Sequence, residues 1–119
     1  MNNCIFPWVI LVPERENIRE IFELNAKDRK VLIEEIAMVS EVLNKTYWPD
    51  KINVAALGNM VEQLHIHVIA RFKTDDAWPE PVWGKGSKAY DEKSALEVAE
   101  KLREACGGIK GFVTIANRP

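Results

Sequence analysis

Residues 63–71 read QLHIHVIAR, and this stretch decides the fold that the sequence predicts. Because side chains alternate between the two faces of a strand, Gln63, His65 and His67 would share one face. The opposite face would carry only aliphatic side chains, namely Leu64, Ile66 and Val68. We therefore predict a strand over residues 63–72 whose aliphatic face lies in the core. Its polar face would then be a rigid surface suited to hold a catalytic group.

Two elements are predicted before this strand. The β-branched and aliphatic run at residues 8–12 lies between Pro7 and Pro13, which is typical of a buried strand. An amphipathic helix capped by Asn25 is predicted over about 26–45, because apolar residues recur there at helical spacing. The residues of this apolar stripe are Leu32, Ile36, Val39 and Leu43.

Further elements are predicted on either side of the strand at residues 63–72. A second strand over residues 51–57 runs into Gly58-Asn59, which suits a tight hairpin, so the two strands should pair antiparallel. Residues 73–90 are polar and contain proline and glycine, which predicts a loop. Residues 91–106 predict a C-terminal helix. Strands and helices mixed without strict alternation indicate an α+β fold.

The composition narrows the class of protein. The 119 residues are 47% hydrophobic and 29% charged, with a formal net charge of −2, which predicts one domain over residues 1–119. A slightly acidic chain argues against a nucleic acid polymer as the ligand, because binding by bulk electrostatics needs a basic stripe. A single nucleotide can still be held by backbone amides and a few side chains.

Cysteine usage and the apolar opening of the chain indicate a cytoplasmic protein. Cys4 and Cys106 are far apart in the sequence and form no C-x-x-C motif, which favours two reduced thiols. The apolar run at residues 4–12 is too short to span a bilayer and lacks a basic leader. We therefore predict no membrane association.

Three interpretations of the His65–His67 pair remain open from spacing alone. The histidines could be half-exposed polar residues with only a structural place in the sheet. They could bind a metal, but zinc needs at least one more ligand, and nothing in the spacing of Asp75 or Asp76 suggests it. Alternatively, one imidazole is a nucleophile or an acid-base group. A phosphorus centre is then a natural target, since the amides of the Gly58-Asn59 turn could hold phosphate oxygens.

Three residues after the pair have both a functional and a structural interpretation. Trp78 and Trp83 could stack on a nucleobase or pack across a dimer interface, or they could pack locally within their loop. Arg71 could steer phosphate, but an exposed arginine at a strand end that bonds to water is the default expectation.

The residues around the two histidines resemble the signature of the histidine triad (HIT) hydrolases and transferases. That signature is three histidines separated by single apolar residues, preceded by Gly-Gln-Ser/Thr-Val. This chain has Gly58-Asn59-Met60-Val61-Glu62-Gln63-Leu64-His65-Ile66-His67-Val68-Ile69. The resemblance covers about residues 5–72 and includes the order of the upstream strand, helix and Asn-bearing strand. The segment WPEPVWG, residues 78–84, is similar to a bacterial branch of the family.

The resemblance implies a two-step reaction at the α-phosphorus of a nucleotide. His65 would be the nucleophile, and water or another acceptor would then displace the nucleotidyl group. His67 and Asn59 would contact the phosphate, with Asn59 replacing a longer glutamine and reaching through a water. Asn53 would lie near the ribose. The resemblance implies no required metal or cofactor, and it implies a homodimer.

Three departures from the family pattern alter what we expect. Gln63 replaces the first histidine, so this position can form hydrogen bonds but cannot titrate near neutrality. Met60 replaces a hydroxyl residue that helps the leaving atom, which should penalise amine leaving groups. The chain also begins almost at its first strand, so we expect the N-terminal family segment that lines the base pocket to be absent.

The sequence therefore predicts a nucleotide hydrolase or nucleotidyl transferase with an α+β, HIT-like fold. The expected intermediate is a nucleotidyl-His65 adduct, and dinucleoside polyphosphates of purines are the preferred substrates. The alternatives are a nucleotide-binding sensor with weakened catalysis and an interaction domain that keeps only the fold.

Overall fold

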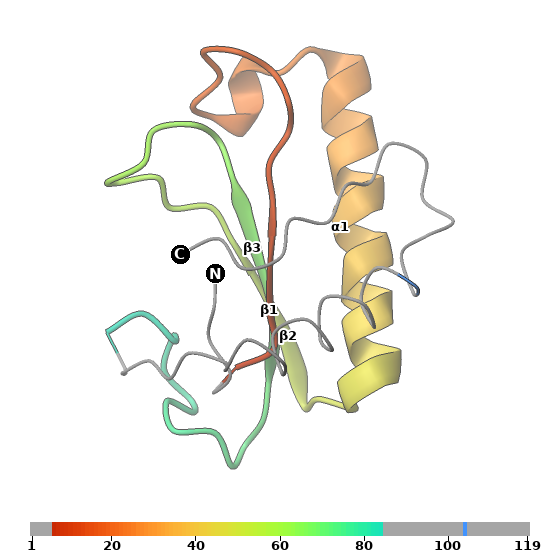
Figure 1. Cartoon of the computed structure of the whole chain (residues 1–119), viewed down its shortest axis with the longest axis vertical. Coiled ribbons are helices and arrows are strands. Elements are labelled where there is room, and N and C mark those ends of the chain that lie inside the picture. Colours follow the sequence, from red (N-terminus) through yellow and green to blue (C-terminus); the bar gives the residue numbers. More distant parts are fainter. Residues whose placement is uncertain (1–5, 85–103, 105–119) are drawn as a thin grey trace.

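The sheet lies between a long helix on one face and an irregular segment on the other (Figure 1). The computed structural model describes residues 6–84 and Glu104. The elements in chain order are β1 (Trp8–Leu11), the short 3-10 helix η1 (Ile21–Glu23), α1 (Ala26–Tyr47), β2 (Lys51–Ala55) and β3 (Ile66–Arg71). This arrangement confirms the α+β prediction.

β3 is the central strand of the three-stranded sheet, whose order is β1-β3-β2. Both neighbours pair with it antiparallel, with Ile10 opposite His67 on one side and Ala55 opposite His67 on the other. The antiparallel pairing of β2 with β3 was predicted and is confirmed. All six residues of β3 are buried, as expected for a strand covered on both faces.

α1 covers the aliphatic face of β3. Asn25 caps the helix, as predicted: its Oδ1 accepts a hydrogen bond of 2.8 Å from the backbone N–H of Asp28. The helix ends at Tyr47, because Trp48 adopts a left-handed conformation with φ of 53°. Its apolar stripe packs against β3, where the buried residues are Leu32, Val39, Leu43, Leu64, Ile66 and Val68. Each fully buried aliphatic side chain stabilises the fold by about 2 kcal/mol.

The connection between β2 and β3 is not the tight hairpin that the sequence predicted. β2 ends at Ala55 and β3 begins at Ile66, so residues 56–65 lie between them. The ladder cannot extend towards Gly58-Asn59, because the backbone N–H of Leu64 donates instead to the carbonyl of Ile18 at 2.8 Å. Gln63 and His65 consequently precede the strand, which is shorter than the predicted 63–72.

Residues 72–84 cover the other face of the sheet without forming a helix or strand. Their buried side chains Ala77 and Val82 join Phe6 and Ile69 in a second apolar cluster, against which Trp8 and Trp83 pack. The predicted helix at 91–106 lies outside the described residues except for Glu104. Within the part of the chain that the structure describes, no helix combines the length and apolarity needed to cross a membrane.

Candidate active site

The candidate site is built on the face of the sheet opposite α1. His67 lies on β3, Trp8 on β1 is opposite Ile69, and Asn53 on β2 is opposite Ile69 from the other side. Side chains that are opposite or diagonal on one face of a sheet lie within contact distance of each other. The sheet therefore brings Trp8 into contact with His67 and places Asn53 on the same face.

His65 lies just before β3 and is partly exposed. Its Nδ1 is 2.7 Å from the backbone carbonyl oxygen of Gln63. A carbonyl oxygen can only accept a hydrogen bond, so Nδ1 must carry the hydrogen. In the neutral ring, Nε2 therefore has a free lone pair, which is the form that a nucleophile requires.

His67 is held by different contacts. Its Nδ1 accepts a hydrogen bond of 2.9 Å from the indole Nε1–H of Trp8, and its ring packs edge-to-face on Trp83 at 5.1 Å. Only 6% of the residue is exposed. Burial, together with the nearby charge of His65, lowers the pKa of His67 to about 4, so this ring is neutral at physiological pH.

The polar face is therefore less open than the sequence predicted. The indole rings of Trp8 and Trp83 cover His67, whereas His65 stays partly exposed. The two imidazole rings lie side by side, with their centroids 5.0 Å apart and their planes at 72°. A ligand that reaches His65 would thus approach the edge of His67 as well.

The other predicted residues occupy different surroundings. Gln63 is partly exposed, and its Nε2 donates to the backbone carbonyl of Arg15 at 3.0 Å. Asn53 accepts a hydrogen bond of 2.8 Å on Oδ1 from Arg71. Because arginine can only donate, the amide of Asn53 is oriented with Oδ1 towards Arg71, which leaves its Nδ2–H groups as donors elsewhere. Asn59 is exposed and forms no hydrogen bond with any described residue.

Arg71 is not the exposed strand-end residue that the sequence predicted. It is 1% exposed, and its Nε and Nη2 form a bidentate ion pair with Asp75 at 2.8 and 3.1 Å. Nη2 also donates to the carbonyl of Glu80 at 2.8 Å, and the guanidinium lies over the rings of Phe6 and Trp78. A buried guanidinium is tolerable only with such a full set of partners.

Asp75 joins this arginine to the segment that follows β3. Burial by itself would raise the pKa of Asp75, but hydrogen bonds from Arg71 and from the backbone N–H groups of Phe72, Trp78 and Ala77 outweigh it and lower the pKa to about 2. The carboxylate thus stays charged and fixes the turn at residues 72–78. The available signal in the sequence was an acidic residue four positions after Arg71, before a segment rich in tryptophan and proline.

Both tryptophans of this segment pack locally in the structure. Trp78 lies over the guanidinium of Arg71, with 5.7 Å between the ring centroid and the guanidinium carbon. Trp83 contacts His67 and also packs edge-to-face on Trp8 at 5.4 Å. The contacts of Arg71 and Asp75 therefore hold in place the segment that carries Trp83 onto His67.

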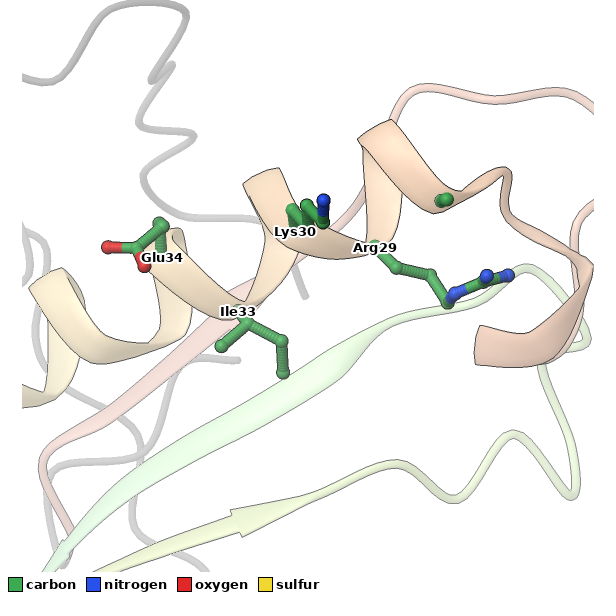
Figure 2. Close-up of a pocket in the computed structure, with 5 residues that line it drawn as sticks. Arg29, Lys30, Ile33 and Glu34 are labelled. Atoms are coloured by element: carbon green, nitrogen blue, oxygen red, sulfur yellow. The ribbon is translucent and has the colours of Figure 1, made fainter.

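A shallow hollow lies elsewhere, along α1 (Figure 2). Its lining residues all belong to this helix and are Ala26, Arg29, Lys30, Ile33 and Glu34. It includes neither histidine. Among the residues that the structure describes, no group of three His, Cys, Asp or Glu side chains is placed to hold a metal ion.

Comparison with known proteins agrees with this fold. The HIT domain family matches residues 1–74. The chain therefore belongs to the HIT domain family, and this membership implies an enzyme of the nucleotide hydrolase or transferase kind. No curated protein gives a match to the chain.

Solved structures of bacterial histidine triad proteins are similar over most of the chain. The protein of Marinobacter aquaeolei VT8 is 47% identical with a TM-score of 0.85, over 88% of this chain and 77% of that one. The protein of Sinorhizobium meliloti 1021 is 44% identical with a TM-score of 0.85, over 88% of this chain and 78% of that one. The protein of Bradyrhizobium japonicum is 40% identical with a TM-score of 0.84, over 88% of this chain and 79% of that one.

Proposed function

We propose that this protein is a nucleotide hydrolase or nucleotidyl transferase that cleaves at the α-phosphorus of a purine nucleotide through a nucleotidyl-His65 intermediate. One observation carries the proposal. The hydrogen bond from Nδ1 of His65 to the carbonyl of Gln63 leaves the lone pair of Nε2 free on a partly exposed ring. Membership of the HIT domain family supplies the reaction class.

The first step is an in-line displacement at phosphorus. The Nε2 lone pair of His65 forms the N–P bond while the bond to the leaving oxygen breaks, and that oxygen departs with the electron pair. His65 becomes a cation in the adduct, and its Nδ1–H remains bonded to the Gln63 carbonyl, which stabilises this charge. Water or another acceptor then attacks phosphorus and loses its proton to solvent, while the N–P bond breaks and His65 departs with the electron pair.

The neighbouring polar groups would stabilise the developing charge on the non-bridging oxygens. His67 is neutral at physiological pH and lies beside His65, so it can donate without repelling a cationic His65. Asn59 is exposed and can turn towards a phosphate. Asn53 has its Nδ2–H groups available for ribose, because Arg71 occupies its oxygen.

We propose dinucleoside polyphosphates as the preferred substrates. Met60 stands where a hydroxyl would assist the departing atom, and its side chain has no proton to donate. A polyphosphate leaves as a stable anion, whereas an amine must be protonated as it departs. The missing hydroxyl therefore penalises phosphoramidates more than polyphosphates.

The test is a rapid-quench search for the adduct. Parent protein mixed with a diadenosine polyphosphate should gain the mass of an adenylyl group within one turnover, and the adduct should be labile to acid. His65→Ala should lose both the adduct and turnover, while His67→Ala should keep the nucleophile and form the adduct more slowly. The proposal fails if His65→Ala hydrolyses each tested substrate as fast as the parent.

A nucleotide-binding module without useful turnover is the second candidate. Gln63 favours it, because this amide cannot relay a proton and its Nε2 is bonded to the Arg15 carbonyl. Calorimetry separates the two candidates. Micromolar binding of adenosine monophosphate without adduct formation supports the module, whereas adduct formation supports the enzyme.

We also propose that the protein forms a homodimer through α1 and the outer edge of β2. Apolar side chains are exposed there: Val31 at 49% and Met38 at 37% on α1, and Val54 at 48% on β2. Among the described strands, β2 pairs only with β3, so one of its edges is free to pair with another strand. A second copy of the chain would cover both features.

A further inference from the structure

The indole N–H of Trp8 fixes which nitrogen of His67 carries hydrogen. Trp8 donates to Nδ1 of His67 at 2.9 Å across 59 positions of sequence. An indole N–H has no lone pair to offer, so it can only donate. In the neutral ring, Nδ1 must then be the acceptor, and the hydrogen lies on Nε2.

We propose that Trp8 is a positioning residue that holds His67 in the Nε2–H tautomer and thereby makes this ring a hydrogen bond donor to the bound phosphate. The inference rests on the proposed function for the identity of the acceptor. The assignment of the tautomer rests on the Trp8 contact alone.

The aromatic surroundings of His67 prevent the ring from reversing this arrangement. Its ring meets Trp8 at a centroid distance of 5.5 Å and a plane angle of 66°. Trp83 meets the ring from another direction, at 5.1 Å and 85°. With 6% of His67 exposed, rotation of the ring about its axis would require Trp8 and Trp83 to move apart.

The groups that face His67 also keep it neutral. On the face of the sheet that carries His67, β1 contributes Trp8 and Ile10, and β2 contributes Ala55, which lies opposite His67. None of these three side chains can titrate. Among the residues that the structure describes, the neighbouring titratable group is His65, whose positive charge would oppose a second one. Burial has the larger effect and the charge of His65 the smaller one, and together they lower the pKa of His67 to about 4. A neutral ring with a fixed tautomer is what a steady donor requires.

The two histidines are thus held in opposite tautomers by different partners. A carbonyl acceptor beside Nδ1 of His65 leaves Nε2 as a lone pair, whereas an N–H donor beside Nδ1 of His67 leaves Nε2 as a donor. The division into nucleophile and donor therefore depends on the backbone carbonyl of residue 63 and on the indole of Trp8 as much as on the histidines themselves.

The matched variants are Trp8→Phe and Trp83→Phe. Both replace an indole beside His67 with a smaller aromatic ring, but only Trp8→Phe removes the hydrogen bond to Nδ1. A purely structural role for Trp8 predicts that both variants behave alike.

Long-range proton–nitrogen correlation spectra of nitrogen-15-labelled protein at pH 7 read the tautomers directly. The parent should show His67 with an unprotonated Nδ1. Trp8→Phe should show averaging of the two tautomers, and Trp83→Phe should keep the parent pattern. A protonated Nδ1 in the parent, or an unchanged tautomer in Trp8→Phe, would overturn the proposal.

A second measurement needs no variant and decides the matter if Trp8→Phe does not fold. The hydrogen bond should produce a nitrogen–nitrogen scalar coupling between Nε1 of Trp8 and Nδ1 of His67 in the parent protein. Its absence overturns the inference. In the folded variant, kcat/KM for a diadenosine polyphosphate should fall by about tenfold, by analogy with the partners that orient metal-binding histidines. If the parent turns over no nucleotide, the proposed function fails, while the spectra still decide the tautomer.

Discussion

His67 links the stability of the fold to the protonation of one ring. Its pKa of about 4 in the folded protein lies below the ordinary value of 6.5, so the unfolded chain binds the proton more tightly. The stability that goes with the neutral ring is complete above pH 6.5. It is lost as the pH falls from 6.5 through 4.

We expect this residue to lower the free energy of unfolding by roughly 3 kcal/mol between pH 6.5 and 4. Urea unfolding of the parent and of His67→Gln at pH 7, 5.5 and 4 measures the difference, because every other titrating group is common to both proteins. The loss should be steeper in the parent. Parallel pH profiles would contradict the assignment.

At the scale of single residues, the sequence predicted which histidines lie together better than it predicted their surroundings. The motif spacing placed His65 beside His67, and the structure brings their rings together. The tautomer of His67 was beyond prediction, because Trp8 is 59 positions away and its contact depends on strand register. The burial of Arg71 was missed for a similar reason, since Asn53 and Phe6, which complete its surroundings, come from other parts of the chain.

The end of β3 and the segment 72–84 depend on one buried ion pair. Arg71→Met should lower the free energy of unfolding by about 3–5 kcal/mol, because Asp75 would remain as an uncompensated buried charge. Chemical denaturation measures this loss. Near-ultraviolet circular dichroism should also change, since Trp78 lies over the lost guanidinium.

Arg19→Met is the matched control for this prediction. Arg19 also pairs with a carboxylate, that of Glu62 at 2.9 Å, but the two side chains are 61% and 68% exposed. An exposed ion pair contributes little to stability, so this variant should unfold almost as the parent does. Equal losses in both arginine variants would show that the buried pair has no special role.

At the scale of elements, patterns predicted the helix and the strands but not the connections between them. The stripe on α1 and its Asn25 cap are local features, so the sequence alone was sufficient. The link between β2 and β3 was predicted as a tight turn from Gly58-Asn59. This prediction was wrong because the backbone N–H of Leu64 forms a hydrogen bond with the carbonyl of Ile18, a contact that local spacing does not encode.

For the whole molecule, we expect sedimentation equilibrium to give about twice the chain mass of 13.6 kDa. Val54→Lys should shift the protein towards the monomer, because a charge would enter the proposed interface. Phe22→Lys is the control, since Phe22 is 78% exposed on η1, outside the proposed surface. A parent protein that sediments as a monomer contradicts the homodimer.

The unequal burial of positions 63, 65 and 67 sets how this protein can diverge over evolutionary time. Gln63 precedes β3 and is partly exposed, and its side-chain amide donates to the backbone carbonyl of Arg15. Exchange of this side chain removes a hydrogen bond to the backbone but breaks no contact with an aromatic ring. His67, enclosed by two indoles, can be exchanged only together with them. Reactivity at the first position is therefore free to drift while the architecture beneath it stays the same.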